Sequence, residues 1–278
     1  MAKPAGPTSH DVVDTVRRAL DVQRVGHLGT LDPFAEGLLV VVVGRATRLA
    51  PFAAGWTKSY EGVIRLGATT DTDDATGTVV ATAPADAVSA AQVAAALAGF
   101  RGGYLQRPPA YSAVKIAGER AYRRARRGEA VEPVPRRVEV RELEMVDFAV
   151  PDVRFRATVG GGTYLRSLAR DVGAALGCGA HLATLRRTAV GPLRLEDAVA
   201  PERVTPAHLR DPAALVADLP RRELTPDERA AVVHGRPLEA GSGERGAGSV
   251  ALFADGQLVA LAEVVEAVLK PRVVLADA

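Results

Sequence analysis

Residues 138–176 read VEVRELEMVDFAVPDVRFRATVGGGTYLRSLARDVGAAL and contain the signals of both kinds of regular structure. The runs 138–148 and 153–159 predict a pair of β-strands. Over 163–176, apolar residues recur at helical spacing and predict a helix with one buried face, formed by Leu165, Leu168, Ala169, Val172 and Leu176. Because strands and helices do not alternate strictly as in β-α-β units, this pattern favours an α+β fold over a doubly wound sheet.

Further elements are predicted on the N-terminal side of this stretch. Helices are expected over 9–20, with Ser9 as the cap of the first turn, over 89–97 and over 119–127. Strands are expected over 38–43, 60–66 and 110–116, and the apolar run 38–43 is typical of a buried strand. The sequence contains no internal repeat.

A domain boundary is predicted where four prolines punctuate residues 200–220, a segment without a long periodic element. Beyond it, Asp255-Gly256 between two apolar runs predicts a hairpin, residues 270–275 predict another strand, and 241–249 (GSGERGAGS) predicts a surface loop. We therefore predict domains over 1–212 and 218–278, the second small and rich in strands. With seven basic and ten acidic residues over 218–278, that module is poorly suited to bind RNA by itself.

Composition excludes several protein classes. The 278 residues are 47% hydrophobic and 24% charged, as in a globular protein. No apolar run approaches the ~18–20 residues of a membrane span, and the N-terminus lacks the apolar stretch of a secretion signal. A single cysteine, Cys178, excludes an internal disulfide and a multi-cysteine zinc site. We therefore expect a cytoplasmic protein without a metal.

Positive charge is concentrated in one segment, although the net charge is only +2. Residues 101–141 hold eleven basic residues against four acidic ones, an excess that suits a polyanion. The chain has four lysines and 31 arginines, and arginine forms paired hydrogen bonds with phosphate and stacks on bases. A general bias of composition towards arginine explains the same counts, so charge alone does not identify a partner.

Residues 26–33 (GHLGTLDP) form a tight segment that could carry chemistry. Gly26 and Gly29 allow a close approach of the backbone to a ligand, and His27 and Asp32 lie in the same loop. A carboxylate in a stiff loop can act as a nucleophile or a base. The alternative is that Asp32, before Pro33, only caps a helix.

Other polar groups are interpreted as structural. Asp71, Asp73 and Asp74 are read as turn and surface residues rather than a magnesium site. Cys178 and His181 have metal-like spacing, but two ligands do not make a zinc site. The turn before residue 163 lacks the Gly-Lys-Ser/Thr ending of a nucleotide-binding loop.

Five stretches in the same order resemble the bacterial tRNA pseudouridine synthase B family, the tRNA pseudouridine-55 synthases. They are KPAGPTS (3–9), GHLGTLDPFAEGLL (26–39), KSYEGVIRLGATTDTDDATG (58–77), QRPPAYSAVKIAGERAYRRARRG (106–128) and GGTYLRSLARDVGAALGCGAHLATLRRTAVG (161–191). The resemblance covers roughly residues 3–200. It implies a pseudouridine synthase fold with a central mixed, largely antiparallel sheet, followed by a PUA-like module. Family members usually have an apolar strand before the Lys-Pro motif, and here Met1 and Ala2 precede Lys3.

The resemblance also implies roles for individual residues. Asp32 matches the family's nucleophilic aspartate, Tyr60 the tyrosine that stacks on the target base and is the candidate for removing its C5 proton, and Arg166 the arginine that pairs with the aspartate. The matches to substrate-contacting positions are His27, Tyr164, Leu185 and Lys3.

The reaction implied by the resemblance is the isomerisation of uridine 55 in the T loop of tRNA to pseudouridine. It needs no cofactor, because no atom is gained and no electron is transferred. A flipped base needs a snug pocket with an aromatic face. We expect a monomer that acts without an obligate protein partner. The rivals are an RNA-binding protein without catalysis and an enzyme that depends on a guide RNA.

Overall fold

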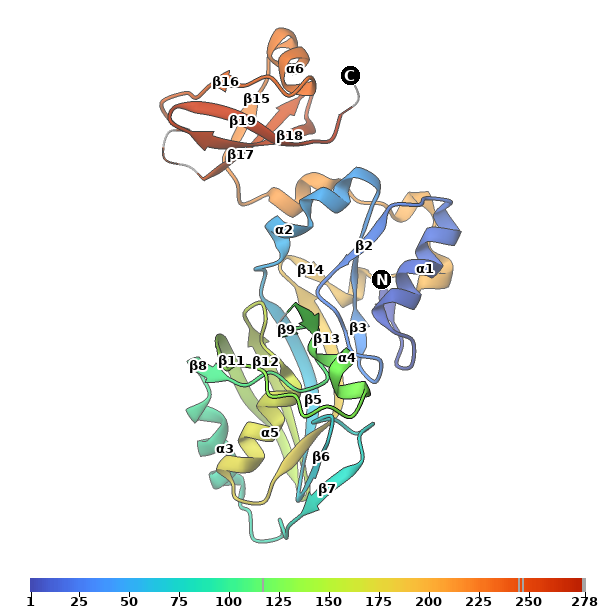
Figure 1. Cartoon of the computed structure of the whole chain (residues 1–278), viewed down its shortest axis with the longest axis vertical. Coiled ribbons are helices and arrows are strands. Elements are labelled where there is room, and N and C mark those ends of the chain that lie inside the picture. Colours follow the sequence, from blue (N-terminus) through green and yellow to red (C-terminus); the bar gives the residue numbers. More distant parts are fainter. Residues whose placement is uncertain (117, 245, 247, 277–278) are drawn as a thin grey trace. The chain divides into compact units, whose positions relative to one another are not determined.

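A computed structural model describes residues 1–116, 118–244, 246 and 248–276, and Figure 1 labels most of their elements. Within these residues, eight strands form a central sheet. Seven lie side by side in the order β1 (Ala2–Lys3), β3 (Glu36–Leu38), β13 (Ala180–Val190), β5 (Lys58–Leu66), β12 (Asp152–Val159), β11 (Arg136–Ala149) and β8 (Gly102–Gln106). The eighth, β14 (Leu193–Arg194), pairs with β13. Only β3 and β13 are parallel among the pairs of this sheet, which confirms the predicted mixed, largely antiparallel arrangement.

Residues 138–176 contribute two neighbouring strands of this sheet and one of its covering helices. Strands β11 and β12 pair antiparallel, with Met145 opposite Phe155. Helix α5 (Leu165–Ala175) contacts β13 and β5 through the predicted apolar face, where Leu168 and Val172 are fully buried. Helix α3 (Ala90–Gly99) packs beside it on β11, and Ser89 caps its first turn. The helices therefore cover the sheet as in an α+β fold.

Smaller elements complete the chain before residue 221. Three two-stranded pairs are present, formed by β2 (Val25–Leu28) with β4 (Val40–Val43), β6 (Ala68–Thr70) with β7 (Val79–Thr82), and β9 (Lys115–Ile116) with β10 (Glu119–Arg120). The remaining α-helices here are α1 (Ser9–Leu20), α2 (Ala50–Ala53) and α4 (Ala121–Arg126). Short 3-10 helices are η1 (Gly44–Leu49), η2 (Leu195–Asp197), η3 (Pro201–Arg203), η4 (Pro206–His208) and η5 (Pro212–Val216).

Two predicted strands are shorter or divided. The run 38–43 is split at Leu39, whose N–H donates to Met1 O at 2.8 Å, so that β3 joins the central sheet and β4 pairs with β2. Of residues 110–116, only Lys115 and Ile116 form a strand. The main chain before them bonds elsewhere, because the carbonyl oxygen of Tyr111 accepts from Arg166.

The predicted cap of the first helix is also wrong. Thr8 Oγ1 accepts from the N–H of Asp11 at 3.1 Å and takes the capping position. Ser9 Oγ instead donates to the carbonyl oxygen of Leu31 and accepts from the N–H of Leu31, both at 2.8 Å. Ser9 therefore joins α1 to the loop that contains Asp32.

Residues 221–276 contain a second sheet, in the order β15 (Arg221–Glu223), β17 (Ser249–Ala254), β18 (Gln257–Val265), β19 (Val268–Val274) and β16 (Leu238–Glu239). Asp255 (φ 50°) and Gly256 (φ 75°) form the predicted tight turn between β17 and β18. Helix α6 (Pro226–Val233), which the sequence analysis missed, packs its buried Val232 into the core of this sheet. In the predicted loop 241–249, residues 245 and 247 lie outside the described residues.

The chain forms two compact units. The first comprises residues 1–12, 29–40 and 55–201, and the second comprises 13–28, 41–54 and 202–278. Within the second unit, Arg48 Nη1 donates to the carbonyl oxygen of Val274 at 2.9 Å, which joins segment 41–54 to β19. Across the described ranges, no helix combines the length and the apolar character that crossing a bilayer requires.

Candidate active site

Asp32 lies in the loop between β2 and β3, and buried groups hold the main chain of this loop. On the side after Asp32, Lys3 Nζ donates to the carbonyl oxygens of Ala35 at 2.7 Å and Pro33 at 3.3 Å. On the side before it, the bonds of Ser9 fix Leu31. Because the loop is bonded on both sides of Asp32, the position of this carboxylate is set by the fold.

A second buried cation, Arg187 of β13, holds the beginning of the same loop. Its guanidinium is fully buried and donates to the carbonyl oxygens of Leu38 at 2.7 Å and Gly29 at 3.0 Å. Gly37 of β3 pairs with Arg187 and allows the two strands to lie close together. A Cβ at Gly37 would lie 2.3 Å from the carbonyl oxygen of Arg187. The glycine also has φ of +110°, a conformation that favours glycine.

Arg166 forms the ion pair that the resemblance implies. It lies in the first turn of α5, and its Nε and Nη2 are 2.9 Å from Oδ2 and 3.2 Å from Oδ1 of Asp32. The paired contacts suit the planar fork of a guanidinium. The Arg166 side chain is only 6% exposed, whereas that of Asp32 keeps 32% of its surface. The carboxylate is therefore held from the protein side and remains accessible on the other.

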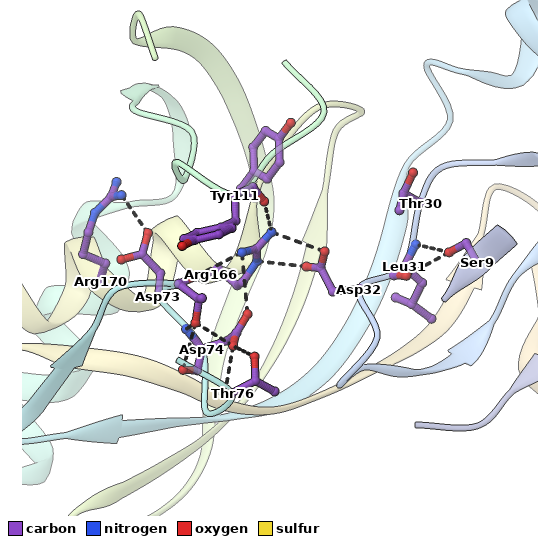
Figure 2. A network of polar contacts seen from close by, with 12 residues as sticks. Ser9, Thr30, Leu31, Asp32, Asp73, Asp74, Thr76, Tyr111, Arg166 and Arg170 are labelled. Atoms are coloured by element: carbon purple, nitrogen blue, oxygen red, sulfur yellow. Dashed lines mark hydrogen bonds and ion pairs between the residues drawn. The ribbon is translucent and has the colours of Figure 1, made fainter. Parts of the chain in front are cut away.

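Further groups orient the guanidinium of Arg166, as Figure 2 shows. Nη1 donates to the carbonyl oxygen of Thr72 at 3.0 Å, and Nη2 donates to that of Tyr111 at 2.9 Å. Oδ2 of Asp74 lies 3.6 Å from Nη1. Arg166 thus joins the Asp32 loop, the aspartate-rich segment and the segment before α4.

The prediction that Asp74 is a surface residue is wrong, whereas its bonds to Thr72 and Thr76 confirm the predicted place in a turn. It is 4% exposed, and its Oδ1 accepts from Thr72 Oγ1 at 2.8 Å and from the N–H of Thr76 at 2.9 Å. Asp73 also faces the helix, where its carboxylate lies 2.9 Å from Arg170 Nη1. Asp71 has the predicted turn role as well, accepting from the N–H of Thr78 at 2.8 Å. The sequence feature that could have pointed to Asp74 was its position within residues 58–77, one of the five stretches that resemble the family.

Burial alters the acidity of the Asp32 carboxyl group. Desolvation by the surrounding protein raises the pKa of Asp32. The guanidinium of Arg166 opposes this rise, and the nearby Asp74 carboxylate adds to it. Burial likewise lowers the pKa of Lys3, with the Asp32 charge acting in the opposite direction. The ionised carboxylate of Asp32 is therefore poorly solvated, and the charge of Arg166 stabilises it.

Tyr60 lies in β5, between Ala157 of β12 and Arg187 of β13. The residue is 7% exposed and lies among the buried residues of the sheet. Among the described contacts, none joins Tyr60 to Asp32.

The other predicted substrate-contacting residues lie in different environments. Tyr164 immediately precedes α5, and burial raises the pKa of its phenol. Leu185 is buried in β13 opposite Gly62. His27 lies half-buried in β2, within the second compact unit. Lys3 is 2% exposed, and its ammonium group is engaged by main-chain oxygens, including that of Pro4 at 2.9 Å.

The basic segment at α4 is partly neutralised within the chain. Arg127 contacts Glu119 at 2.6 Å and Glu129 at 2.7 Å, and Arg124 contacts Glu129 at 2.7 Å. These ion pairs are exposed and therefore weak. Their arginines remain able to exchange a carboxylate for a phosphate.

Among the described residues, no group of three or more His, Cys, Asp and Glu side chains is placed to hold a metal ion. Cys178 is a buried free cysteine, and Nδ1 of His181 lies 2.9 Å from the carbonyl oxygen of Ala68. The chemistry that the site offers is that of a carboxylate paired with a guanidinium.

Sequence comparisons identify related proteins over most of the chain. A family model described as "TruB family pseudouridylate synthase (N terminal domain)" matches residues 17–165, and one described as "tRNA pseudouridylate synthase B C-terminal domain" matches residues 166–231. The tRNA pseudouridine synthase B of Thermobifida fusca (strain YX) is 48% identical over 272 residues, 94% of this chain and 92% of the relative. That of Azoarcus sp. (strain BH72) is 42% identical over 281 residues, 99% of this chain and 93% of the relative.

Solved structures show the same fold. The chain is similar to one in the crystal structure of the archaeal box H/ACA sRNP Nop10-Cbf5 complex, with a TM-score of 0.72 and 27% identity over 99% of this chain and 85% of that one. A Cbf5-Nop10-Gar1 complex gives a TM-score of 0.72 and 28% identity, with 99% and 84% coverage. The fold is therefore that of a pseudouridine synthase. With both family domains matched in order, the chain belongs to the TruB family of tRNA pseudouridine synthases, enzymes that isomerise uridine in tRNA to pseudouridine.

Proposed function

We propose that this enzyme isomerises uridine 55 in the T loop of tRNA, and that Asp32 is its catalytic carboxylate. The observation that carries the proposal is the ion pair of Asp32 with Arg166, in which the arginine is buried and the carboxylate keeps an accessible side. Arg166 favours the ionised form of this carboxylate against the effect of burial and aims it, as a nucleophile or base requires.

The reaction breaks the bond between C1′ and N1 and forms a bond between C1′ and C5. The proton on C5 is lost and N1 gains one, so the product is an isomer of the substrate. Asp32 can begin this sequence by attacking the sugar, by attacking the base, or by removing the proton on C2′. In all three routes Tyr60, from its place in β5, stacks on the flipped base and takes the C5 proton through its phenol.

Three of the remaining candidates contact the substrate in this proposal. Tyr164 and Leu185 line the base pocket, Leu185 excludes water, and His27 helps to hold the opened RNA loop. Lys3 contributes through the Asp32 loop, because three carbonyl oxygens already engage its ammonium group.

We further propose that the enzyme acts as a monomer in the cytoplasm, without a guide RNA. Relatives named tRNA pseudouridine synthase B are 42–48% identical to this chain, whereas chains of the box H/ACA complexes are 25–28% identical. We also propose domains over 1–212 and 218–278. In support of the second, one hydrophobic cluster is built entirely from residues between Leu224 and Ala276.

The test is an assay of purified protein with an unmodified T-stem-loop transcript, with no other protein or RNA present. Formation of pseudouridine at position 55 supports the proposal. Tight binding without product would favour the RNA-binding rival, and product that appears only after a guide RNA and partner proteins are added would favour the guide-dependent one. A transcript with cytidine at position 55 is the matched control.

A further inference from the structure

Gln106, the last residue of β8, is fully buried and bonds to the main chain of Tyr164 through both ends of its amide. The N–H of Tyr164 donates to Oε1 at 2.8 Å, and Nε2 donates to the carbonyl oxygen of Tyr164 at 3.1 Å. One side chain thereby satisfies both main-chain groups, as a neighbouring strand would.

The orientation of this amide is fixed by its partners. Because Oε1 must accept from an N–H, Nε2 faces the carbonyl oxygen and also donates to the hydroxyl of Tyr104. Burial raises the pKa of that phenol, and the charge of the nearby carboxylate of Asp171 in α5 adds to the rise. The amide therefore stands in a chain of polar contacts that begins and ends on the helix carrying Arg166.

Tyr164 connects the amide of Gln106 to the helix that carries Arg166. It is the N-cap of α5, with extended φ and ψ of −103° and 112°, and no side chain caps the first turn from this position. Its carbonyl oxygen accepts the first helical bond, from the N–H of Leu168 at 3.0 Å. Arg166 follows two residues later, so the rotation of this turn directs its guanidinium.

We propose that Gln106 is a positioning residue for the reaction: its amide fixes the main chain of Tyr164, and through the first turn of α5 it aims Arg166 at Asp32. This inference rests on the proposed catalytic role of the Asp32–Arg166 pair. It assigns to β8 a part in the site although no residue of that strand touches Asp32 in the described contacts.

Gln106→Met is the first test, because it keeps the length of the side chain and removes both hydrogen bonds. A guanidinium displaced by about 1 Å should lower kcat by about tenfold to a hundredfold while KM and tRNA affinity stay close to wild type. If the methionine variant does not fold, Gln106→Asn serves as the second test, because it withdraws the amide by one methylene group. It should likewise lower kcat while KM and tRNA affinity stay close to wild type. Tyr104→Phe is the control, since it leaves both bonds to Tyr164 intact, and it should retain wild-type kcat.

The pH dependence of kcat distinguishes a positioning role of Gln106 from a purely structural one. It should change in the Gln106 variants only if Gln106 positions Arg166. The groups that act on Asp32 are Arg166, Asp74 and Lys3, and only Arg166 would shift in the Gln106 variants. A weakened ion pair lets the pKa of Asp32 rise, so the acidic limb of kcat should move to higher pH in Gln106→Met and remain in place in Tyr104→Phe.

The outcomes separate this inference from the proposed function. Unchanged kcat, or a loss of kcat with an unmoved acidic limb, in a folded Gln106 variant would overturn the role of Gln106. If Asp32→Asn itself retains wild-type turnover, the catalytic assignment fails instead. Inactive Asp32→Asn together with fully active Gln106→Met would leave the proposed function standing and refute this inference alone.

Discussion

Nε of Arg166 lies 2.9 Å from Oδ2 of Asp32, and 134 residues of chain separate the two side chains. Because α5 supplies one partner and the loop before β3 the other, the ion pair forms only when the central sheet has brought both elements together. The proposed catalytic pair is thus set by tertiary structure.

Asp32→Asn should abolish turnover while tRNA binding survives. The amide has nearly the size of the carboxylate but is neither a nucleophile nor a base, so the rate should fall by at least about a thousandfold. Single-turnover assays on a T-stem-loop measure the rate, and a filter-binding assay measures the affinity. Residual turnover above a few per cent of wild type, in protein free of the host enzyme, would remove Asp32 from its role.

Tyr60→Phe separates stacking from proton transfer. The ring remains and the hydroxyl is lost, so RNA binding should persist while the rate falls by about a hundredfold or more. The appropriate measurement is the single-turnover rate at saturating enzyme. A rate equal to that of wild type would show that the hydroxyl does not remove the C5 proton.

Asp74→Asn tests the support of Arg166 from the aspartate-rich segment. The amide cannot match the carboxylate facing Nη1 of Arg166, so we expect kcat to fall by about tenfold to a hundredfold with little change in KM. Asp71→Asn is the matched control, because Asp71 accepts only from the main chain of Thr78 in the described contacts and should keep wild-type kcat. Equal kcat values for the two variants would contradict the assignment.

The rate should fall as the pH is lowered, starting above the range of an ordinary aspartate. Burial raises the pKa of Asp32, so its carboxylate takes up a proton at higher pH than the free side chain, whose pKa is about 3.9. A carboxylate required in its ionised form is then lost on the acidic side. A pH profile of the single-turnover rate should show a limb of unit slope there, and a flat profile down to the ordinary range would oppose this explanation.

Gly37→Ala should destabilise the sheet next to the Asp32 loop. A Cβ would meet the main chain of Arg187 at 2.3 Å, and φ of +110° is strained for alanine, so the free energy of unfolding should fall by about 2–3 kcal/mol. Gly55→Ala is the control, because nothing lies within 4 Å of its Cβ position and its φ is ordinary. Chemical denaturation of both variants measures this difference in stability, and equal midpoints would refute the predicted destabilisation by Gly37→Ala.

Local periodicity predicts those elements whose burial pattern is regular. Strands β11 and β12 and helix α5 follow the expected ranges closely. Strand β13 could not be predicted in this way, because its sequence places Arg187 at a fully buried position. The carbonyl oxygens of Gly29 and Leu38 satisfy that charge, and partners about 150 residues distant leave no local signal.

The residues of the candidate site were also only partly predictable from the sequence. The resemblance identified Asp32 and Arg166, and the structure brings them into contact. It did not distinguish Asp74 from its neighbours Asp71 and Asp73, since all three are short acidic residues in one segment. Which carboxylate turns inward depends on the bonds from Thr72 and Thr76, which form only in the folded segment.

Strand β13 lies between β3 and β5 in space, yet it is the last of these three to be synthesised. Until residues 180–190 have left the ribosome, β3 and β5 have no common neighbour and Arg187 cannot reach the main chain of Gly29 and Leu38. A nascent chain that has already completed Asp32, Tyr60 and Arg166 therefore still lacks the strand on which their final arrangement depends, and the enzyme cannot become active before that strand emerges.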